Sequence, residues 1–343
     1  MRIGITYNLK SDVSISSSEP FAEDIAEEFD LPETIQAIQD VLSGEGHDVY
    51  RLGGNLDVLE QIKRFRIEFV FNIAEGFHGR NREAHIPALL ELLKIPYSGS
   101  DPLGLAITLD KSLAKRVAIS LGISTPKFWI LDQKNNFEEI SNQFPLFVKP
   151  LWQGSSRGIR RSSRVENRSQ LGQEINRLFE HYSGEPVLVE EYISGREFTV
   201  GVIGNKPPEI LGVMELSFRE GMNRDFCYSL EVKRNWKSEV EYHVPVQLDR
   251  TIEKGIEDAA SSLFKVLRLR DFARFDFRVN SKGQFYFLEA NPLAGLSPES
   301  GDIIILGKKK GLGYSEIILK ILHAAFGRYP ELTQSKVTGG TNG

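Results

Sequence analysis

The chain has 343 residues, of which 41% are hydrophobic and 26% are charged, and this length suffices for two or three compact units. A formal net charge of −5 lacks the basic excess that nucleic-acid binding requires. No run of about 18 apolar residues indicates a membrane span, and the apolar stretch at the N-terminus is too short and too early for a signal peptide. The single cysteine, Cys227, excludes an internal disulfide framework. These features predict a cytoplasmic protein that binds neither nucleic acid nor membrane.

Strands alternate with helices over the first hundred residues, which predicts a mostly parallel, doubly wound sheet over residues 1–105. We expect the first helix to begin at Asp30, because Asp30 and Glu33 have capping-box spacing and Pro32 lies in the first turn. The polar and then acidic segment 10–29 is predicted to be an exposed loop. Strands are expected at 2–7, 47–52 and 69–73, the first helix up to the glycines at 44 and 46, and a second helix at 87–93.

Two further α+β units are predicted to follow this sheet. The division that we expect is an N-terminal unit over 1–107, a central unit over 108–193, a C-terminal unit over 194–329 and a flexible tail over 330–343. Helices are expected at 109–123, 170–179 and 251–267, strands at 124–131, 145–150, 186–193 and 197–204, a long polar connection at 217–243, and a hairpin at 273–291.

The hairpin carries polar side chains on one face. In ARFDFRV, residues 273–279, the charged residues alternate with Phe275, Phe277 and Val279. If Val279 pairs with Gln284, Arg274 lies opposite Glu289, Asp276 lies opposite Phe287, and all four side chains point the same way. Asp276 and Glu289 then become diagonal neighbours roughly 7 Å apart. Together with Asn291 they offer hard oxygen ligands that suit magnesium, although a salt-bridged sheet face with Arg274 and Arg278 explains the pattern equally well.

Two other segments contain groups suited to a nucleotide. In VKPLWQGSSRG, Lys149 ends a strand, and a loop with Ser155 and Ser156 follows that can offer N–H groups and hydroxyls to phosphates. In VLVEEYISGREFTV, residues 187–200, a strand ends in acids and a tyrosine, which could form a hinge between two units. An ordinary surface loop and a solvated edge strand remain alternative interpretations. The basic cluster Arg157, Arg160, Arg161 and Arg164 is interpreted as a solvated face, with an anion site as the alternative.

The order of these segments resembles the ATP-grasp superfamily and, within it, the D-alanine–D-alanine ligase family. The resemblance covers roughly residues 85–325. It includes IPYSGSDPLGLAITLDK, FPLFVKP followed by QGSSRG, VLVEEYISGREFTV, RFDFRV and GQFYFLEANPLAGL. It implies an N-terminal α/β domain followed by a two-part ATP-grasp domain that holds ATP between its halves.

The resemblance also implies roles for individual residues. Asp276 and Glu289 match the ligands of one Mg²⁺ ion, Glu289 and Asn291 match those of a second, and Mn²⁺ is expected to substitute. The nucleotide-binding matches are Lys111, Lys149, Ser155, Ser156, the adenine hinge Glu190, Glu191, Tyr192 and Ile193, and the ribose-binding acid Glu197. The catalytic matches are Arg274 with the Gly295 backbone at the acyl-phosphate, Ser155 in the closing loop, and Lys233 on a mobile loop that reaches the γ-phosphate. Ser300 matches a serine that contacts the acceptor carboxylate.

The donor half departs from the family pattern. The family carries a glutamate just after the first strand that holds the donor's ammonium, and we cannot place it here. Glu75 and His78 lie in the segment expected to border the donor pocket, so they are the candidate substrate residues. Arg234 follows Lys233 where the family has a lysine–tyrosine pair, and Gln153 replaces a common acid. We therefore expect a donor other than D-alanine.

The predicted activity is an ATP-dependent carboxylate–amine ligase that joins small amino-acid-like molecules through an acyl-phosphate. One alternative is a ligase acting on a carrier-bound or peptide substrate, for which the acidic segment 19–30 is the candidate docking surface. A second alternative is a catalytically silent nucleotide-binding regulator, which the retained metal set argues against. Whether the chain forms a homodimer is left open.

Overall fold

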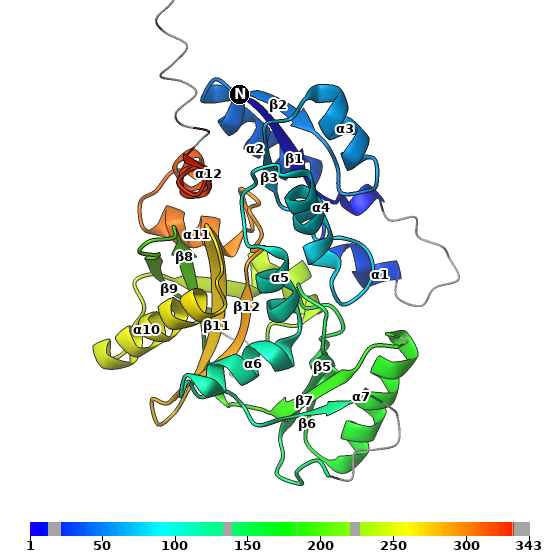
Figure 1. Ribbon diagram of the computed structural model, residues 1–343. Helices are drawn as coiled ribbons and strands as arrows, with labels where there is room; N and C mark the ends of the chain where they lie inside the picture. The colour runs from blue at the N-terminus through cyan, green and yellow to red at the C-terminus, as the bar shows by residue number, and fades with distance from the viewer. Residues whose placement is uncertain (13–21, 133–138, 183, 220–226, 331, 333–343) are drawn as a thin grey trace, which may run out of the picture.

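The computed structural model describes residues 1–12, 22–132, 139–182, 184–219, 227–330 and 332. They form three sheets of three, four and five strands (Figure 1). The fold is therefore α/β with one parallel and two antiparallel sheets, which confirms the predicted fold class. No helix among these residues has the length and apolar character needed to cross a membrane.

The N-terminal sheet is parallel, with strand order β2-β1-β3. Tyr97 extends it through an isolated parallel bridge to Val70. Helix α2 buries Ile35, Ile38 and Leu42 against it, as the apolar spacing predicts. The elements of this region are β1 (Arg2–Thr6), η1 (Lys10–Asp12), α1 (Ala22–Ile25), η2 (Ala26–Glu28), α2 (Pro32–Gly44), β2 (Asp48–Arg51), α3 (Val58–Phe65), β3 (Phe69–Asn72), η3 (Arg82–Ala84), α4 (His85–Leu93) and α5 (Pro102–Leu109).

The central sheet is antiparallel, with strand order β4-β7-β5-β6, and α7 packs on it through Leu171, Ile175 and Leu178. Helix α6 precedes this sheet in sequence, yet it packs on the C-terminal sheet, where Ala114 and Ala118 join the core beneath β12. The elements are α6 (Lys111–Ser120), β4 (Phe128–Leu131), β5 (Leu146–Pro150), η4 (Arg161–Ser163), β6 (Arg164–Val165), α7 (Arg168–His181) and β7 (Val187–Glu191).

The C-terminal sheet is antiparallel, with strand order β10-β9-β8-β11-β12, and α10 covers one of its faces. Phe198, Phe275 and Phe277 are fully buried beneath that helix. The elements are β8 (Gly195–Ile203), β9 (Glu209–Phe218), α8 (Leu230–Arg234), α9 (Trp236–Glu239), β10 (Val240–His243), α10 (Arg250–Val266), β11 (Phe272–Asn280), β12 (Phe285–Asn291), α11 (Asp302–Lys309) and α12 (Tyr314–Phe326).

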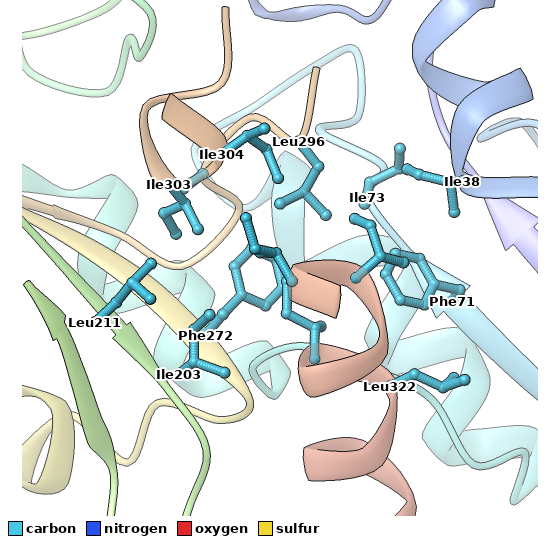
Figure 2. Close-up of a cluster of buried hydrophobic side chains, with 14 of the residues drawn as sticks. Ile38, Phe71, Ile73, Ile203, Leu211, Phe272, Leu296, Ile303, Ile304 and Leu322 are labelled. Carbon is cyan, nitrogen blue, oxygen red and sulfur yellow. The ribbon is translucent and has the colours of Figure 1, made fainter. Parts of the chain in front are cut away.

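One hydrophobic core joins the first and last parts of the chain. Helix α12 lies between the N-terminal sheet and the C-terminal sheet, and its Leu322 is fully buried (Figure 2). Side chains from both sheets meet there, and each buried aliphatic or aromatic group contributes about 1.5–3 kcal/mol. This shared core holds the two sheets in one arrangement. The labelled members are Ile38, Phe71, Ile73, Ile203, Leu211, Phe272, Leu296, Ile303, Ile304 and Leu322.

Two local predictions are wrong. Leu31, not Asp30, is the N-cap of α2 and no side chain caps it, because the Asp30 backbone instead pairs with residues 8–10 in a bridge. Residues 22–29 are not an exposed loop, since α1 and η2 bury Asp24, Glu28 and Phe29. Residues 13–21 and most of the predicted tail, 330–343, lie outside the described residues.

Candidate active site

One cavity of about 280 Å³ gathers side chains from the two antiparallel sheets and from segments that flank the N-terminal sheet. The hairpin β11–β12 forms one wall, the end of β7 and the loop after β5 form another, and the segment before α2 closes the third side. Because these segments are far apart in sequence, only the packing of the three units creates the cavity. Of the predicted site residues, it is lined by Glu75, Lys149, Ser155, Ser156, Glu190, Glu191, Tyr192, Ile193, Glu197, Lys233, Arg274, Asp276, Glu289, Asn291, Gly295 and Ser300.

The predicted hairpin register is wrong by one residue near the turn and by two residues at the site. Val279 pairs with Phe285, and a bulge places Asp276 directly opposite Glu289 and Arg274 opposite Asn291. Phe287 consequently faces the core and packs on Phe277, with ring centroids 5.8 Å apart. Bulges often occur beside active sites because they redirect side chains. Here the bulge brings the two carboxylates closer than the regular hairpin would.

The carboxylate pair lies in a charged and partly buried setting. Arg274 is 2.9 Å from Asp276 and 2.7 Å from Asp302, whereas its distance to Glu289 is 3.9 Å. Thr199 donates its hydroxyl hydrogen to Asp276. Burial and the neighbouring Glu289 raise the pKa of Asp276 to about 6 despite Arg274. Asp302 is a site residue that we did not predict, and its only sequence signal is an acid at the start of a helix.

The donor set fits a divalent metal ion. The described residues contain no group of three or more His, Cys, Asp or Glu that could enclose one. Magnesium needs only one or two protein carboxylates, because water and phosphate oxygens complete its octahedron. Asp276 and Glu289 supply such carboxylates, and Asn291, whose Oδ1 also accepts a hydrogen bond from the Leu293 N–H, lies beside them.

Two lysines pair with the buried Glu190 next to this carboxylate pair, and a third lysine approaches Glu289. Glu190 is 2.7 Å from Lys149 and 2.9 Å from Lys115, and Lys111 is 3.9 Å from Glu289. Burial raises the pKa of Glu190, but Lys115 and Lys149 outweigh it and lower the pKa to about 2. Lys115 was not predicted, although it lies one helical turn after Lys111 and so shares its face.

The loop after β5 has the backbone that a phosphate cradle needs. Ser155 and Ser156 both adopt left-handed backbone conformations, with φ of 53° and 61°. Such angles are uncommon for residues other than glycine and turn the chain sharply. Ser156 donates its hydroxyl hydrogen to the Tyr228 carbonyl at 2.9 Å. Lys111 donates to the carbonyl of Gln153 in the same loop.

The end of β7 and the start of β8 form the expected hinge region. Glu191, Tyr192 and Ile193 line the cavity. The guanidinium groups of Arg164 and Arg278 lie 4.6 and 4.8 Å from the centroid of the Tyr192 ring. Burial raises the pKa of Glu197 to about 7, and Arg278, 3.9 Å away, only partly offsets this.

Lys233 belongs to the short helix α8 rather than to an extended loop. Its ammonium donates to the carbonyls of Glu27 and Ser155 at 2.9 and 3.1 Å. Burial lowers the pKa of Lys233 to about 8. These contacts bring three parts of the chain together: the N-terminal segment that contains Glu27, the loop after β5 that carries Ser155 and Ser156 (the serine loop), and helix α8.

Glu28 is the main site-bordering residue that sequence reasoning missed. It is 8% exposed and pairs with Arg82 at 2.8 Å and with Arg157 at 2.9 Å. Its carboxylate also accepts a hydrogen bond from the Gly154 N–H at 2.6 Å. Nearby, Asp24 accepts from the Gly158 N–H at 3.1 Å. These acids follow a run of polar residues, so the only sequence signal is the apolar spacing of Ile25 and Phe29.

These contacts correct two interpretations. Arg157 does not belong to a solvated face, because it pairs with Glu28, and Arg160 lies 3.8 Å from Asp24. Arg161, in contrast, is largely exposed. The described part of the segment 19–30 packs against the serine loop, so it does not present a free docking surface.

The predicted substrate residues separate in the structure. Glu75 and Ser300 line the cavity, and Ser300 donates to Ser297 Oγ at 3.1 Å. Glu75 makes no hydrogen bond or ion pair within the described residues. His78 is exposed and is not among the lining residues, so the structure does not bring it to the cavity.

Comparison with known proteins relates most of the chain to one family. A family model described as D-ala D-ala ligase C-terminus matches residues 117–323. A D-alanine--D-alanine ligase of Aquifex aeolicus is 31% identical over 290 residues, covering 84% of this chain and 93% of that protein. The uncharacterized protein y4sG of Sinorhizobium fredii is 32% identical over 292 residues, covering 83% and 84%.

Solved structures share the fold. The D-alanine--D-alanine ligase of Bacillus anthracis complexed with ATP superposes with a TM-score of 0.72 at 22% identity, covering 96% of this chain and 99% of that one. The VanG D-Ala:D-Ser ligase of Enterococcus faecalis gives a TM-score of 0.71 at 21% identity, covering 94% and 99%.

Proposed function

Because this chain belongs to the D-alanine–D-alanine ligase family of ATP-grasp enzymes, we propose that it joins two small amino-acid-like molecules through an acyl-phosphate, with a donor other than D-alanine. The chain is an ATP-dependent carbon–nitrogen ligase, and its family uses ATP and a divalent metal ion. The observation that carries the proposal is the joint presence, in one cavity, of the carboxylate pair, Lys149, Lys233 and the serine loop.

The nucleotide occupies the side of the cavity nearest the central sheet. Residues 190–193 and Glu197 hold its base and ribose, while Lys111, Lys149 and the serine loop hold its phosphates. Backbone N–H groups of a sharply turned loop bind phosphate oxygens, and lysines add point charges. Glu190 carries one negative charge, whereas the two lysines that pair with it, Lys115 and Lys149, carry two positive charges. A net positive charge therefore remains for the phosphates.

Asp276, Glu289 and Asn291 would hold two Mg²⁺ ions, or Mn²⁺ in their place, and the metal would supply charge neutralisation on the phosphates. The donor carboxylate attacks the γ-phosphorus, and ADP leaves as the acyl-phosphate forms. Arg274 orients and stabilises the acyl-phosphate and then the tetrahedral intermediate, assisted by the Gly295 N–H. Lys233 and Ser155 exclude water from the intermediate. An amine then attacks the acyl carbon and phosphate leaves, while Ser300 binds the acceptor carboxylate.

The donor assignment rests on the N-terminal side of the cavity. Glu75 lines it and has no partner among the described residues, so its carboxylate is available to bind a substrate ammonium. Glu27 and Glu28, by contrast, are held by arginines. Because the acids on this side of the cavity depart from the pattern of the family, we expect a donor that differs in shape or charge from D-alanine.

The decisive experiment is a matrix of amino-acid pairs with ATP and Mg²⁺, read as phosphate release and product mass. We expect amide formation with at least one pair that excludes D-alanine as donor. Rapid dipeptide synthesis from D-alanine alone would contradict the donor assignment. Absence of phosphate release across the matrix, with ATP shown to bind, would contradict the ligase proposal for free small molecules.

The Glu75→Ala variant tests the donor residue. Its apparent affinity for the donor should weaken far more than its affinity for ATP, which calorimetry measures directly. Unchanged donor kinetics would remove Glu75 from the site.

We also infer a cytoplasmic location from the single cysteine, and fractionation of cells tests it. Sedimentation equilibrium decides whether the chain forms a homodimer.

A further inference from the structure

The N-terminal end of the cavity carries an excess of negative charge. The lining residues contributed by the first 75 positions include one cation and four acids. The charged residues of this group are Lys10, Glu27, Glu28, Asp30 and Glu75. Buried acids are stable only when cations or hydrogen-bond donors compensate them, so the partner of each acid matters.

Two of the four acids are compensated within the protein. Glu27 lies 2.9 Å from Arg234 and 3.6 Å from Lys10, and Glu28 is held by the arginine pair described above. Asp30 and Glu75 differ from them. Their side chains make no hydrogen bond and no ion pair with any described residue. The nearby cations are therefore already engaged with other carboxylates.

Asn8 links the two backbone segments that carry Asp30 and Glu75, and the charge of Asp30 acts on Glu75. Asn8 is 1% exposed. Its carbonyl accepts from the Asp30 N–H at 2.9 Å, and its side-chain oxygen accepts from the N–H of Gly76 at 2.8 Å. Gly76 follows Glu75 directly and has a φ of 75°, and a Cβ there would lie 2.4 Å from the Arg82 carbonyl. The backbone beside both carboxylates is thus hydrogen-bonded to Asn8.

The surroundings disfavour charge on both groups when nothing is bound. Burial, followed by Glu83 and Glu28, raises the pKa of Glu75 well above its ordinary range, and Arg82 offsets this only in part. Burial raises the pKa of Asp30 to about 7 against the opposing effect of Lys10.

We propose that Asp30 and Glu75 select a substrate with two positively charged groups, a diamino carboxylate, at this end of the cavity. One carboxylate binds the α-ammonium and the other binds the side-chain ammonium. A monoamino acid leaves one half-buried acid without a partner, so it binds less well. This inference rests on the proposed ligase function and names the substrate class for it.

A matched pair of substrates tests the inference. The compounds α,γ-diaminobutyrate and α-aminobutyrate differ by one amine, and each enantiomer is assayed as a donor with a fixed acceptor. We expect kcat/KM to favour the diamino compound by at least about tenfold. Asp30→Asn should remove most of this preference and leave the KM for ATP within about twofold. Equal kcat/KM values for the two compounds would overturn the inference and leave the ligase proposal intact.

Glu33→Gln provides the control for charge. Glu33 is an exposed acid in the first turn of α2, so its substitution removes the same charge near the same segment. It should retain the preference. If Asp30→Asn and Glu33→Gln behave alike, the inference is wrong. ATP binding by calorimetry shows that each variant is folded.

Proton release gives a readout that does not depend on turnover. Protonated acids must ionise to bind ammonium groups, so diaminobutyrate binding at pH 7 should release protons. Calorimetry in buffers of different ionisation enthalpy, with a non-hydrolysable ATP analogue and Mg²⁺ present, measures this. Release with the diamino compound alone, even without phosphate release from any pair, would sustain the inference while contradicting the ligase proposal. Identical release from both compounds would overturn it.

Discussion

Glu28→Gln removes the charge that joins the N-terminal segment to the serine loop while it preserves the shape of the side chain. Arg82 and Arg157 are 3% and 8% exposed and would lose their shared partner. The Gly154 N–H would lose a charged acceptor at 2.6 Å. We expect lower stability and a raised KM for ATP, because Gly154 belongs to the loop proposed to hold the phosphates.

The lowered pKa of Glu28 gives the expected size of the loss in the free energy of unfolding. Burial raises this pKa, but Arg82 and Arg157 outweigh burial and lower it from 4.5 to about 2. That difference corresponds to about 3 kcal/mol, similar to the typical cost of breaking a buried ion pair. A carboxyl whose pKa is lowered by folding stabilises the fold above its unfolded pKa. The stabilisation is lost as the pH falls through the folded pKa, so the window lies between about 4.5 and 2.

Urea unfolding of the wild type and the variant measures the difference. We expect about 3 kcal/mol at pH 7 and about 2 kcal/mol at pH 3.5. Glu33→Gln, on the exposed face of α2, serves as the control and should change stability by less than about 0.5 kcal/mol. A loss below about 1 kcal/mol for Glu28→Gln, or a loss that does not shrink in acid, would refute the role of the ion pairs.

Three further predictions concern the site and its frame. Glu289→Gln should reduce kcat by more than about tenfold without lowering the unfolding midpoint, since it removes a charge proposed to bind both metal ions; retention of most activity would exclude that role. Amide hydrogen exchange in residues 227–243 around Lys233 should slow when a non-hydrolysable ATP analogue and Mg²⁺ bind, and unchanged exchange with nucleotide bound would exclude closure. Gly195→Ala should destabilise the fold by more than about 2 kcal/mol in urea unfolding, because its φ is 149° and a Cβ would lie 2.1 Å from the Val279 carbonyl. A smaller loss would mean that β8 and β11 can separate there.

Local sequence patterns predicted most of the strands, but fewer than half of the α-helices, in the described part of the chain. The alternation in residues 273–279 identified β11 and its buried face, where Phe275 and Phe277 are fully buried. The helix expected at 251–267 is α10 within one residue at each end. The helices α1, α3, α5, α8, α9, α11 and α12 were not predicted, and α12 packs between the N-terminal sheet and the C-terminal sheet. Periodicity identifies an element when its own residues carry the pattern.

The order of motifs also predicted the family, but not how the cavity is closed. A β-bulge adds one residue without a local signature, so the pairing of Asp276 with Glu289 required the folded hairpin. The ion pair between Glu28 and Arg157 joins residues 129 positions apart, and nothing near either residue specifies the other. Likewise, Asp30 has the spacing of a helix cap, and only the bridge to residues 8–10 turns it toward the cavity. The sequence by itself therefore determined the elements and the nucleotide motifs, because these depend on neighbours along the chain. The tertiary structure decided the partners of the charged side chains, because burial brings together groups from distant segments and makes their charges interact strongly.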